Sequence, residues 1–218
     1  MSKSNKYGYA GVDIPTQAFK ANTGKFDPSE INELIAEDKW TTLGQMDLIE
    51  TKTFSAVNHV AFTDMEVDTY NVHFVTYKFT SGSGDVGIFA TFGVNNGDGT
   101  YTYRDSNNRY AQQYGEADTT FGEYKSTSMW AMQLCNLGSM QDVEYSFNGY
   151  VYLYNLGDAS KSSFNTNHSI YVSRTDLDAA INYGGGVYET AERHEAFKMA
   201  PNTGNTTGYA SLYGIRFS

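Results

Sequence analysis

The sequence has one cysteine among its 218 residues, Cys135. A single thiol excludes an intrachain disulfide and a zinc site built from several cysteines. Cys135 stands in the apolar stretch WAMQLCNL, with no cationic neighbour to activate it. We therefore expect a small buried side chain on a strand rather than a reactive thiol.

Positive charge and long apolar runs are also scarce. Lys and Arg number 15 against 25 Asp and Glu, which gives a formal net charge of -10. Nucleic-acid binding needs clustered cations, so we expect no nucleic-acid partner. No run approaches the roughly 20 apolar residues that cross a bilayer, and the start MSKSNKYGYAGVDIP lacks the apolar segment of a secretion signal. We therefore expect no membrane insertion, and we expect the protein to be made in a cytoplasm.

Local signatures of catalysis are missing. The sequence has no G-x-S-x-G, H-E-x-x-H or G-x-x-x-x-G-K-[ST]. Acidic pairs could serve glycoside hydrolysis, and they are Glu116 with Asp118, Asp176 with Asp178, and Glu189 with Glu192. His194, in ETAERHEAF, could share a metal with Glu192 or Glu195 if this segment were a short helix. Solvated loop charges explain these residues better, so we expect no enzyme and no cofactor.

Aromatic residues and glycine are abundant, with 18 Tyr, 13 Phe and 21 Gly against 3 Pro. This composition favours strands and tight turns over helices. Turn signals stand at SGSGD (81–85) and NNGDGT (95–100), and we interpret YGGGV (183–187) as a flexible loop. The chain length suits one large all-β domain.

The alternation of side chains predicts strands at 45–54, 58–65, 69–80, 85–94, 100–104, 127–136, 142–155, 168–173 and 208–217. The segments 105–126 and 174–207 are rich in Asn, Gly, Thr and acidic residues, and we expect them to be long loops that carry function or assembly. These elements favour a jelly-roll-like two-sheet β-sandwich over residues 41–218.

Two stretches show a period of two. In GYASLYGIRFS, Tyr209, Tyr213 and the other odd positions face one way, so we expect a final strand paired inside a sheet. In FNGYVYLYNLGD, three tyrosines (Tyr150, Tyr152 and Tyr154) alternate with Val151 and Leu153, and we expect this strand to be covered on both sides.

The first forty residues form a separate region. Residues 1–26 carry isolated hydrophobic residues without periodicity, as in an extended arm lying on a surface. In FDPSEINELIAEDKW, a capping box and a proline predict a helix over about 28–38. We assign assembly contacts in residues 1–40 to Ile31, Leu34, Ile35 and Trp40. A helix this short is stable only when docked.

Aromatic residues in the two predicted loops offer a second function. Tyr110, Tyr114, Tyr183 and Tyr188 are candidate contacts for a host-surface glycan. Trp130 could also stack on sugar, but its apolar neighbours in SMWAMQLC favour core packing.

The order of three stretches resembles a family: IPTQAFKANTGKFDPSEINELIAEDKWTTLGQMDLIET, then FTDMEVDTYNVHFVTYKF, then GYASLYGIRF. Matching positions are Trp40, Gly44, Leu48, Ile49, Glu50 and Thr51, and at the end Leu212, Tyr213, Gly214 and Ile215. The chain is similar to virion structural proteins of tailed bacteriophages, especially marine cyanophages, of the tail-fibre or head-decoration type.

The resemblance implies a jelly-roll-like virion module that often forms trimers and carries no catalytic residue. Its implied partners are other virion proteins, with the arm at residues 1–40 as the attachment. We expect a homotrimer located in the virion.

Overall fold

The chain divides into two units, Met1–Gly44 and Gln45–Ser218. A computed structural model describes residues 32–33, 46–81, 86–117, 121–138, 146–172 and 179–216. Of the predicted helix 28–38, it describes Asn32 and Glu33, which are helical and exposed. The rest of the predicted arm and helix lies outside the described residues, together with the assembly residues Ile31, Leu34, Ile35 and Trp40.

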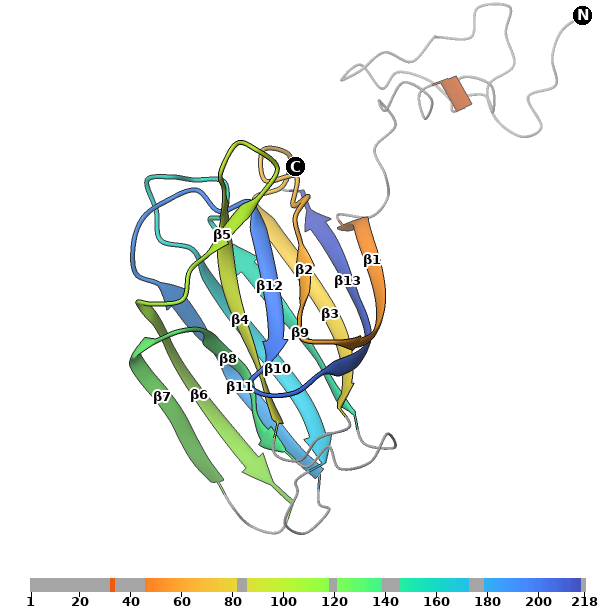
Figure 1. Cartoon of the computed structure of the whole chain (residues 1–218), viewed down its shortest axis with the longest axis vertical. Helices are drawn as coiled ribbons and strands as arrows, with labels where there is room; N and C mark the ends of the chain where they lie inside the picture. The colour runs from red at the N-terminus through yellow and green to blue at the C-terminus, as the bar shows by residue number, and fades with distance from the viewer. Residues whose placement is uncertain are drawn as a thin grey trace, which may run out of the picture. The chain divides into compact units, whose positions relative to one another are not determined.

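Thirteen strands of the described residues form two antiparallel sheets that face each other (Figure 1). The large sheet has the order β1 (Met46–Val57), β13 (Thr206–Ile215), β3 (Val72–Ser81), β9 (Phe147–Tyr154), β10 (Phe164–Val172), β11 (Ala179–Tyr188), β6 (Asn108–Glu116) and β7 (Phe121–Met129). The small sheet has the order β2 (Val60–Phe62), β12 (Ala196–Pro201), β4 (Val86–Asn95) and β5 (Tyr101–Tyr103), and β8 (Met132–Gly138) also pairs with β4. The predicted all-β two-sheet sandwich is confirmed.

The final strand is an interior strand, as predicted. β13 pairs with β1 along one side and with β3 along the other. Tyr209 and Tyr213 point away from the small sheet, whereas Ala210 and Leu212 are buried. The turn at 95–100 is also confirmed, because Gly97 and Gly99 both adopt a φ of 84° between β4 and β5.

The two predicted long loops are wrong. Segment 105–126 contains β6 and most of β7, and segment 174–207 contains β11 and β12. The predicted strand 127–136 is divided between β7 and β8. The segment around His194 is not a short helix, the condition on which a metal site there depended, because residues 189–195 form an irregular connection into β12.

The glycine-rich stretch at 183–187 lies inside β11 rather than in a flexible loop. A Cβ at Gly184 would collide with the carbonyl oxygen of Ala111 in β6, and one at Gly185 with that of Asn165 in β10. Glycine therefore allows the backbones of three neighbouring strands to approach closely.

The core between the sheets is large and aromatic. Its fully buried side chains include Phe62, Phe79, Phe92, Phe147, Ile88, Leu134, Leu153, Phe197 and Met199. Burial of each such side chain stabilises the fold by about 1.5–3 kcal/mol. Cys135 belongs to this core in β8, as predicted.

One end of the interior is polar. The inward side chains of β6, β10 and β11 include the buried residues Asn108, Gln112, Asn165, Asn167, Ser169 and Asn182. Asn167 Nδ2 donates to the carbonyl of Leu134 in β8 at 2.7 Å, and Gln112 Nε2 donates to the carbonyl of Gln133. β8 pairs with β4 alone among the described strands, so these amides satisfy carbonyls that an edge strand leaves unpaired.

Candidate functional site

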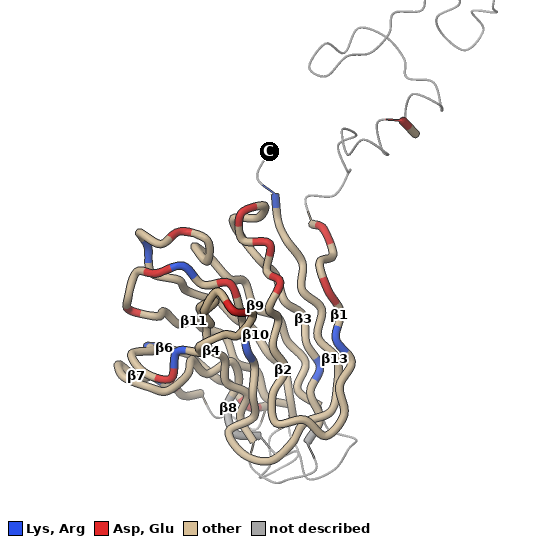
Figure 2. The backbone as a smooth tube through the Cα atoms, turned by 45° about the horizontal axis from the view of Figure 1, so that its top comes forward, with Lys and Arg blue, Asp and Glu red and all other residues tan. Residues whose placement is uncertain are grey.

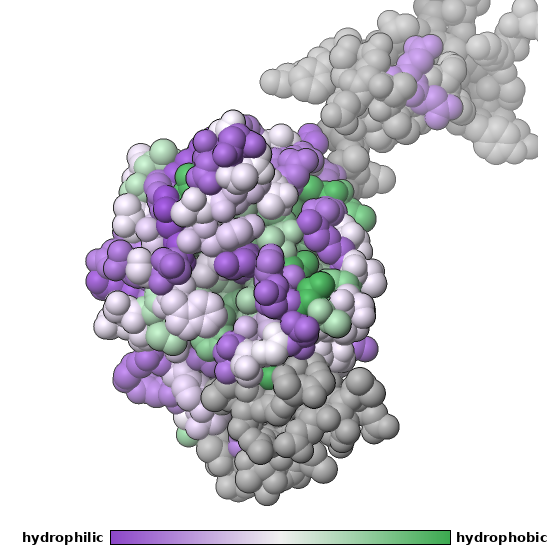
Figure 3. Space-filling view, in the orientation of Figure 1, coloured by the Kyte–Doolittle hydropathy of each residue, from purple (hydrophilic) through white to green (hydrophobic). Residues whose placement is uncertain are grey.

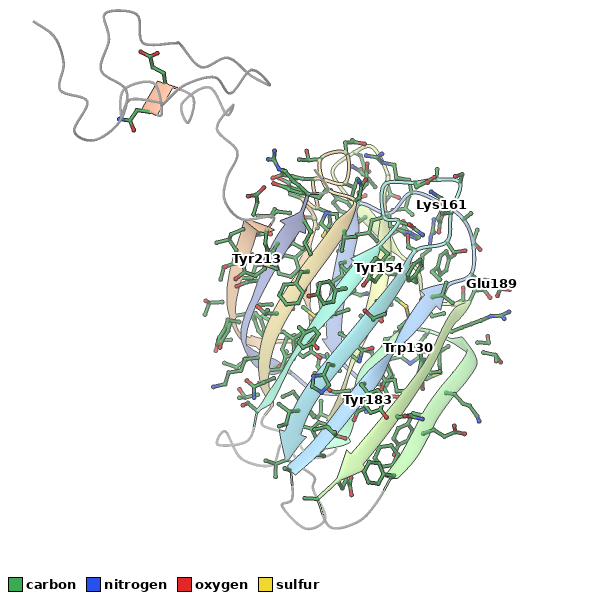
Figure 4. All side chains as sticks on the ribbon, turned by 180° about the vertical axis from the view of Figure 1, so that it is seen from behind. Trp130, Tyr154, Lys161, Tyr183, Glu189 and Tyr213 are labelled. Atoms are coloured by element: carbon green, nitrogen blue, oxygen red, sulfur yellow. The ribbon has the colours of Figure 1, made fainter. Side chains whose placement is uncertain are left out.

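The outward side of the large sheet carries a surface that we call the aromatic face. It consists of outward side chains on β13, β3, β9, β10 and β11: Tyr209, Tyr213, Phe74, Tyr150, Tyr152, Tyr154, Phe164, His168, Ile170, Ile181 and Tyr183. Figure 4 looks onto this side and shows Tyr213, Tyr154 and Tyr183 spread across it. No described element covers it, so the prediction that β9 is covered on both sides is not met within the described residues.

Strand register places these side chains in rows across the sheet. Tyr150 of β9 is paired with His168 of β10, and His168 is paired in turn with Tyr183 of β11. Two rows along, Tyr154 is paired with Phe164. Because alternate residues of a strand share a face, single-strand alternation becomes a continuous two-dimensional surface.

The rings contact one another and hold each other in place. The centroids of Tyr154 and Phe164 lie 4.9 Å apart with their planes inclined by 23°. Those of Phe74 and Tyr152 lie 4.7 Å apart, and those of Tyr150 and His168 lie 5.5 Å apart in an edge-on arrangement. Such contacts fix the ring orientations before any ligand arrives.

The aromatic face is nevertheless open to solvent. Tyr150 is 39% exposed, Tyr183 46% and Tyr209 49%. Apolar groups that remain exposed on this scale indicate a binding surface. By contrast, the small-sheet side in Figure 3 is mainly hydrophilic, with small hydrophobic patches between hydrophilic residues.

Charge is nearly missing from this side. Among the outward positions of the five strands, Lys78 is the one Lys, Arg, Asp or Glu that the described residues contain. Figure 2 shows charged residues instead in loops at one end of the sandwich and on the edge strands β1 and β7. The aromatic face is thus a neutral area on an acidic protein.

A hollow of about 450 Å³ continues the aromatic face over β1, β13 and β3. Its lining consists of Thr53, Phe54, Ser55, Lys78, Thr80, Thr207, Gly208 and Tyr209. Four of these side chains carry aliphatic hydroxyls, one is an ammonium and one is the exposed ring of Tyr209. The hollow therefore offers hydrogen-bonding groups beside an aromatic surface.

The structure does not bring the four predicted glycan tyrosines together. Tyr183 lies on the aromatic face, where its hydroxyl donates to Gln113 Oε1 of β6. Tyr110, Tyr114 and Tyr188 point to the opposite side of the large sheet.

All three contact other aromatic or core groups. Tyr188 is 7% exposed, which contradicts its role as a stacking residue, and its ring lies edge-on to His194. Tyr114 stacks on Tyr124 with centroids 4.8 Å apart, and Tyr110 packs against the core.

Trp130 differs from its predicted place in the core. The ring is 41% exposed and lies on Phe89 of β4, with centroids 5.0 Å apart. It shields Phe89, which is 8% exposed, and so covers the core from outside.

A buried cluster around His194 has the residue types of a catalytic triad. His194 Nδ1 lies 2.8 Å from Ser163 Oγ, and its Nε2 lies 3.3 Å from Glu192 Oε1. Ser163 and His194 are both 0% exposed, so a substrate has no access to the hydroxyl. Burial lowers the pKa of His194 to about 4, despite the opposing effect of Glu192. The imidazole is neutral at neutral pH and acts as a structural group.

The acidic pair Glu189 and Glu192 is held by arginines. Arg104 donates to both carboxylate oxygens of Glu192, at 2.6 and 2.5 Å, and Arg109 donates to both oxygens of Glu189. Burial raises the pKa of Glu192, but the hydrogen bonds and the positive charge of Arg104, together with smaller contributions, outweigh it and leave the pKa lowered. An acid held ionised cannot serve as a proton donor.

Three of the remaining acidic candidates lie in parts of the chain that the structure does not describe. Asp118, Asp176 and Asp178 lie outside the described residues. Within the described ranges, no group of three His, Cys, Asp or Glu side chains could hold a metal ion. No helix in that part of the chain has both the length and the apolar character to span a bilayer.

Sequence reasoning found part of the aromatic face and missed the rest. The alternation of Tyr150, Tyr152 and Tyr154 was visible, but Phe74 and Phe164 join them through pairing between distant strands.

Comparisons of the chain with protein-family models, curated proteins and solved structures found no match.

Proposed function

We propose that this chain is a non-enzymatic structural subunit of a tailed-bacteriophage virion, either a capsid-decoration protein or a tail-appendage protein. One observation carries the proposal. The described residues present an extensive exposed aromatic surface, the aromatic face, whereas their buried Ser–His–Glu cluster has no access for a substrate. The resemblance of the sequence to virion structural proteins supplies the biological setting.

In this proposal residues 1–40 attach the subunit to other virion proteins, and the protein resides in the virion after synthesis in the host cytoplasm. The subunit forms a homotrimer, as the resemblance implies. The apolar residues Ile31, Leu34 and Ile35 share one face of the predicted helix and need a surface to cover them.

The attachment is tested by deleting residues 2–40 from the gene in the phage that encodes it. The sandwich should still fold, by circular dichroism of the purified protein, and the subunit should disappear from purified virions by quantitative mass spectrometry. Incorporation at the normal copy number would contradict the attachment role. Sedimentation of the full chain as a monomer at tens of micromolar would contradict the trimer.

A second function, carbohydrate recognition, is favoured by a separate observation. Tyrosine rings on the aromatic face are both exposed and fixed by contacts with one another. The carbon–hydrogen faces of a sugar ring pack well on such rings, while the phenol hydroxyls bond to sugar hydroxyls. A virion subunit with this property would attach to polysaccharide on the host surface.

A further inference from the structure

We propose that the aromatic face binds an uncharged polysaccharide, with the hollow beside Tyr209 as one of its sugar subsites. This inference rests on the second proposed function and deepens it. It moves the site from the predicted loops to the outward side of the large sheet, and it names the chemical class of the ligand.

The first argument is the spacing of the rings. Tyr150, Tyr152 and Tyr154 follow one another along β9, and register adds Phe74 on one side and Phe164 on the other. A single sugar would use one or two of these rings. A surface with repeated stacking positions instead suits a chain of sugars, because each added sugar gains a contact of the same kind.

The second argument is charge. Polysaccharides that carry a carboxylate or sulfate on each repeat need several cations, since each anion that leaves water needs a partner. The aromatic face offers Lys78 alone among its described outward positions, and the whole chain carries a net charge of -10. An uncharged chain avoids both the missing partners and the repulsion.

The third argument is the composition of the hollow. Thr53 and Ser55 supply hydroxyls that can both donate and accept hydrogen bonds. The Thr80 hydroxyl already donates to the carbonyl of Thr207 at 3.1 Å and can still accept, and the Thr207 hydroxyl already accepts from a backbone amide of β1 at 3.0 Å and can still donate. The ring of Tyr209 supplies a stacking surface beside them. This combination matches a sugar ring, whose faces are apolar and whose rim carries hydroxyls.

A second copy of the chain is the competing occupant. Such an interface would bring together two proteins of the same negative charge and would bury many phenol hydroxyls, each needing a partner. A polysaccharide brings a hydroxyl partner for each of them. We therefore favour the sugar chain and treat self-association as an outcome of the test.

The test is affinity electrophoresis of the purified full chain in gels that contain one polysaccharide each. The neutral probes are linear β-glucan, xylan, mannan and dextran, and the anionic probes are alginate and dextran sulfate. We expect at least one neutral polymer to retard the protein. Tyr150→Ala and Tyr209→Ala should each weaken this binding by about tenfold, because each removes one stacking ring.

Three variants serve as controls. Phe121→Ala removes a ring that is 80% exposed on β7, outside the aromatic face, and should leave the binding unchanged. Tyr209→Phe keeps the ring and should bind more tightly than Tyr209→Ala. Lys78→Gln changes a residue that lines the hollow and separates charge from stacking, so it should weaken binding of a neutral polymer less than Tyr209→Ala does, since an uncharged ligand does not depend on the ammonium charge. Thermal unfolding of each variant verifies that it is folded.

Three results would overturn the inference. They are no retardation by any neutral polymer, retardation by anionic polymers alone that Lys78→Gln abolishes, and self-association that Tyr150→Ala abolishes while no sugar binds. Virion incorporation of Tyr150→Ala is measured in parallel. Normal incorporation without polysaccharide binding by the wild-type protein would refute this inference and leave the structural role standing.

Discussion

Mild acid should destabilise the sandwich through His194. This imidazole is fully buried between Ser163 and Glu192, and burial lowers its pKa from 6.5 to about 4. The unfolded chain therefore takes up a proton before the folded chain does. The contribution of the neutral His194 to the free energy of unfolding is fully present above the unfolded-state pKa of 6.5. It is lost as the pH falls from 6.5 to about 4.

The size of the effect follows from the two pKa values. Between about pH 7.5 and pH 5, a shift from 6.5 to about 4 removes about 2 kcal/mol from the free energy of unfolding. Burial also lowers the pKa of His73, so that histidine adds to the loss with the same sign. A net stability of about 5–15 kcal/mol makes such a loss easy to measure.

The assay is urea unfolding of the residues 45–218 unit within the full chain, followed by tryptophan fluorescence at several pH values. His194→Gln should be less stable at neutral pH, yet its stability should fall by about 2 kcal/mol less on acidification than that of the wild type. His59→Gln, which removes an exposed histidine, is the matched control. Equal pH slopes for His194→Gln and the wild type would refute the reasoning.

Three further predictions concern the stability and the packing of the sandwich. Asn182→Ala should cost about 2–4 kcal/mol, because it leaves Gln112 Oε1 and the Tyr171 hydroxyl without the bonds of 2.9 Å that Asn182 makes with them; a loss below about 1 kcal/mol in urea unfolding would contradict this. Burial raises the pKa of the Cys135 thiol, so a thiol reagent should modify it only at the rate of unfolding, and rapid labelling of the native protein would be the opposite result. Gly208→Ala should lower the melting temperature, since the added Cβ would collide with a backbone carbonyl of β3; an unchanged melting temperature would show that the strand shifts at little cost.

The sequence predicted the strands in which every second side chain is apolar and lies on the buried face. β3, β4, β9 and β13 were all found, because residues such as Val75 and Leu212 recur with a period of two on the buried face. The turn at 95–100 was found from glycines that adopt positive φ. Local patterns were sufficient for these elements and for the all-β class.

Two of the missed strands, β6 and β11, have polar or very small inward residues. β6 turns Asn108 and Gln112 inward, and β11 turns Asn182 inward and continues with glycines. A hydrophobic period cannot detect such strands, because their amides are buried through bonds to partners far away in the sequence. For the same reason the sequence could not place Tyr188 and Tyr183 on opposite sides of the sheet.

The strand β10 supports the proposal that the aromatic face binds a ligand. Its inward residues Asn165, Asn167 and Ser169 are polar, whereas its outward residues include Phe164 and Ile170. This is the reverse of the polarity expected for a sheet with one solvated face. The inward polarity is explained by donation to β8, as when Asn167 donates to the carbonyl of Leu134. The outward apolar side chains add nothing to the core, so their character fits a surface that binds rather than one that only stabilises.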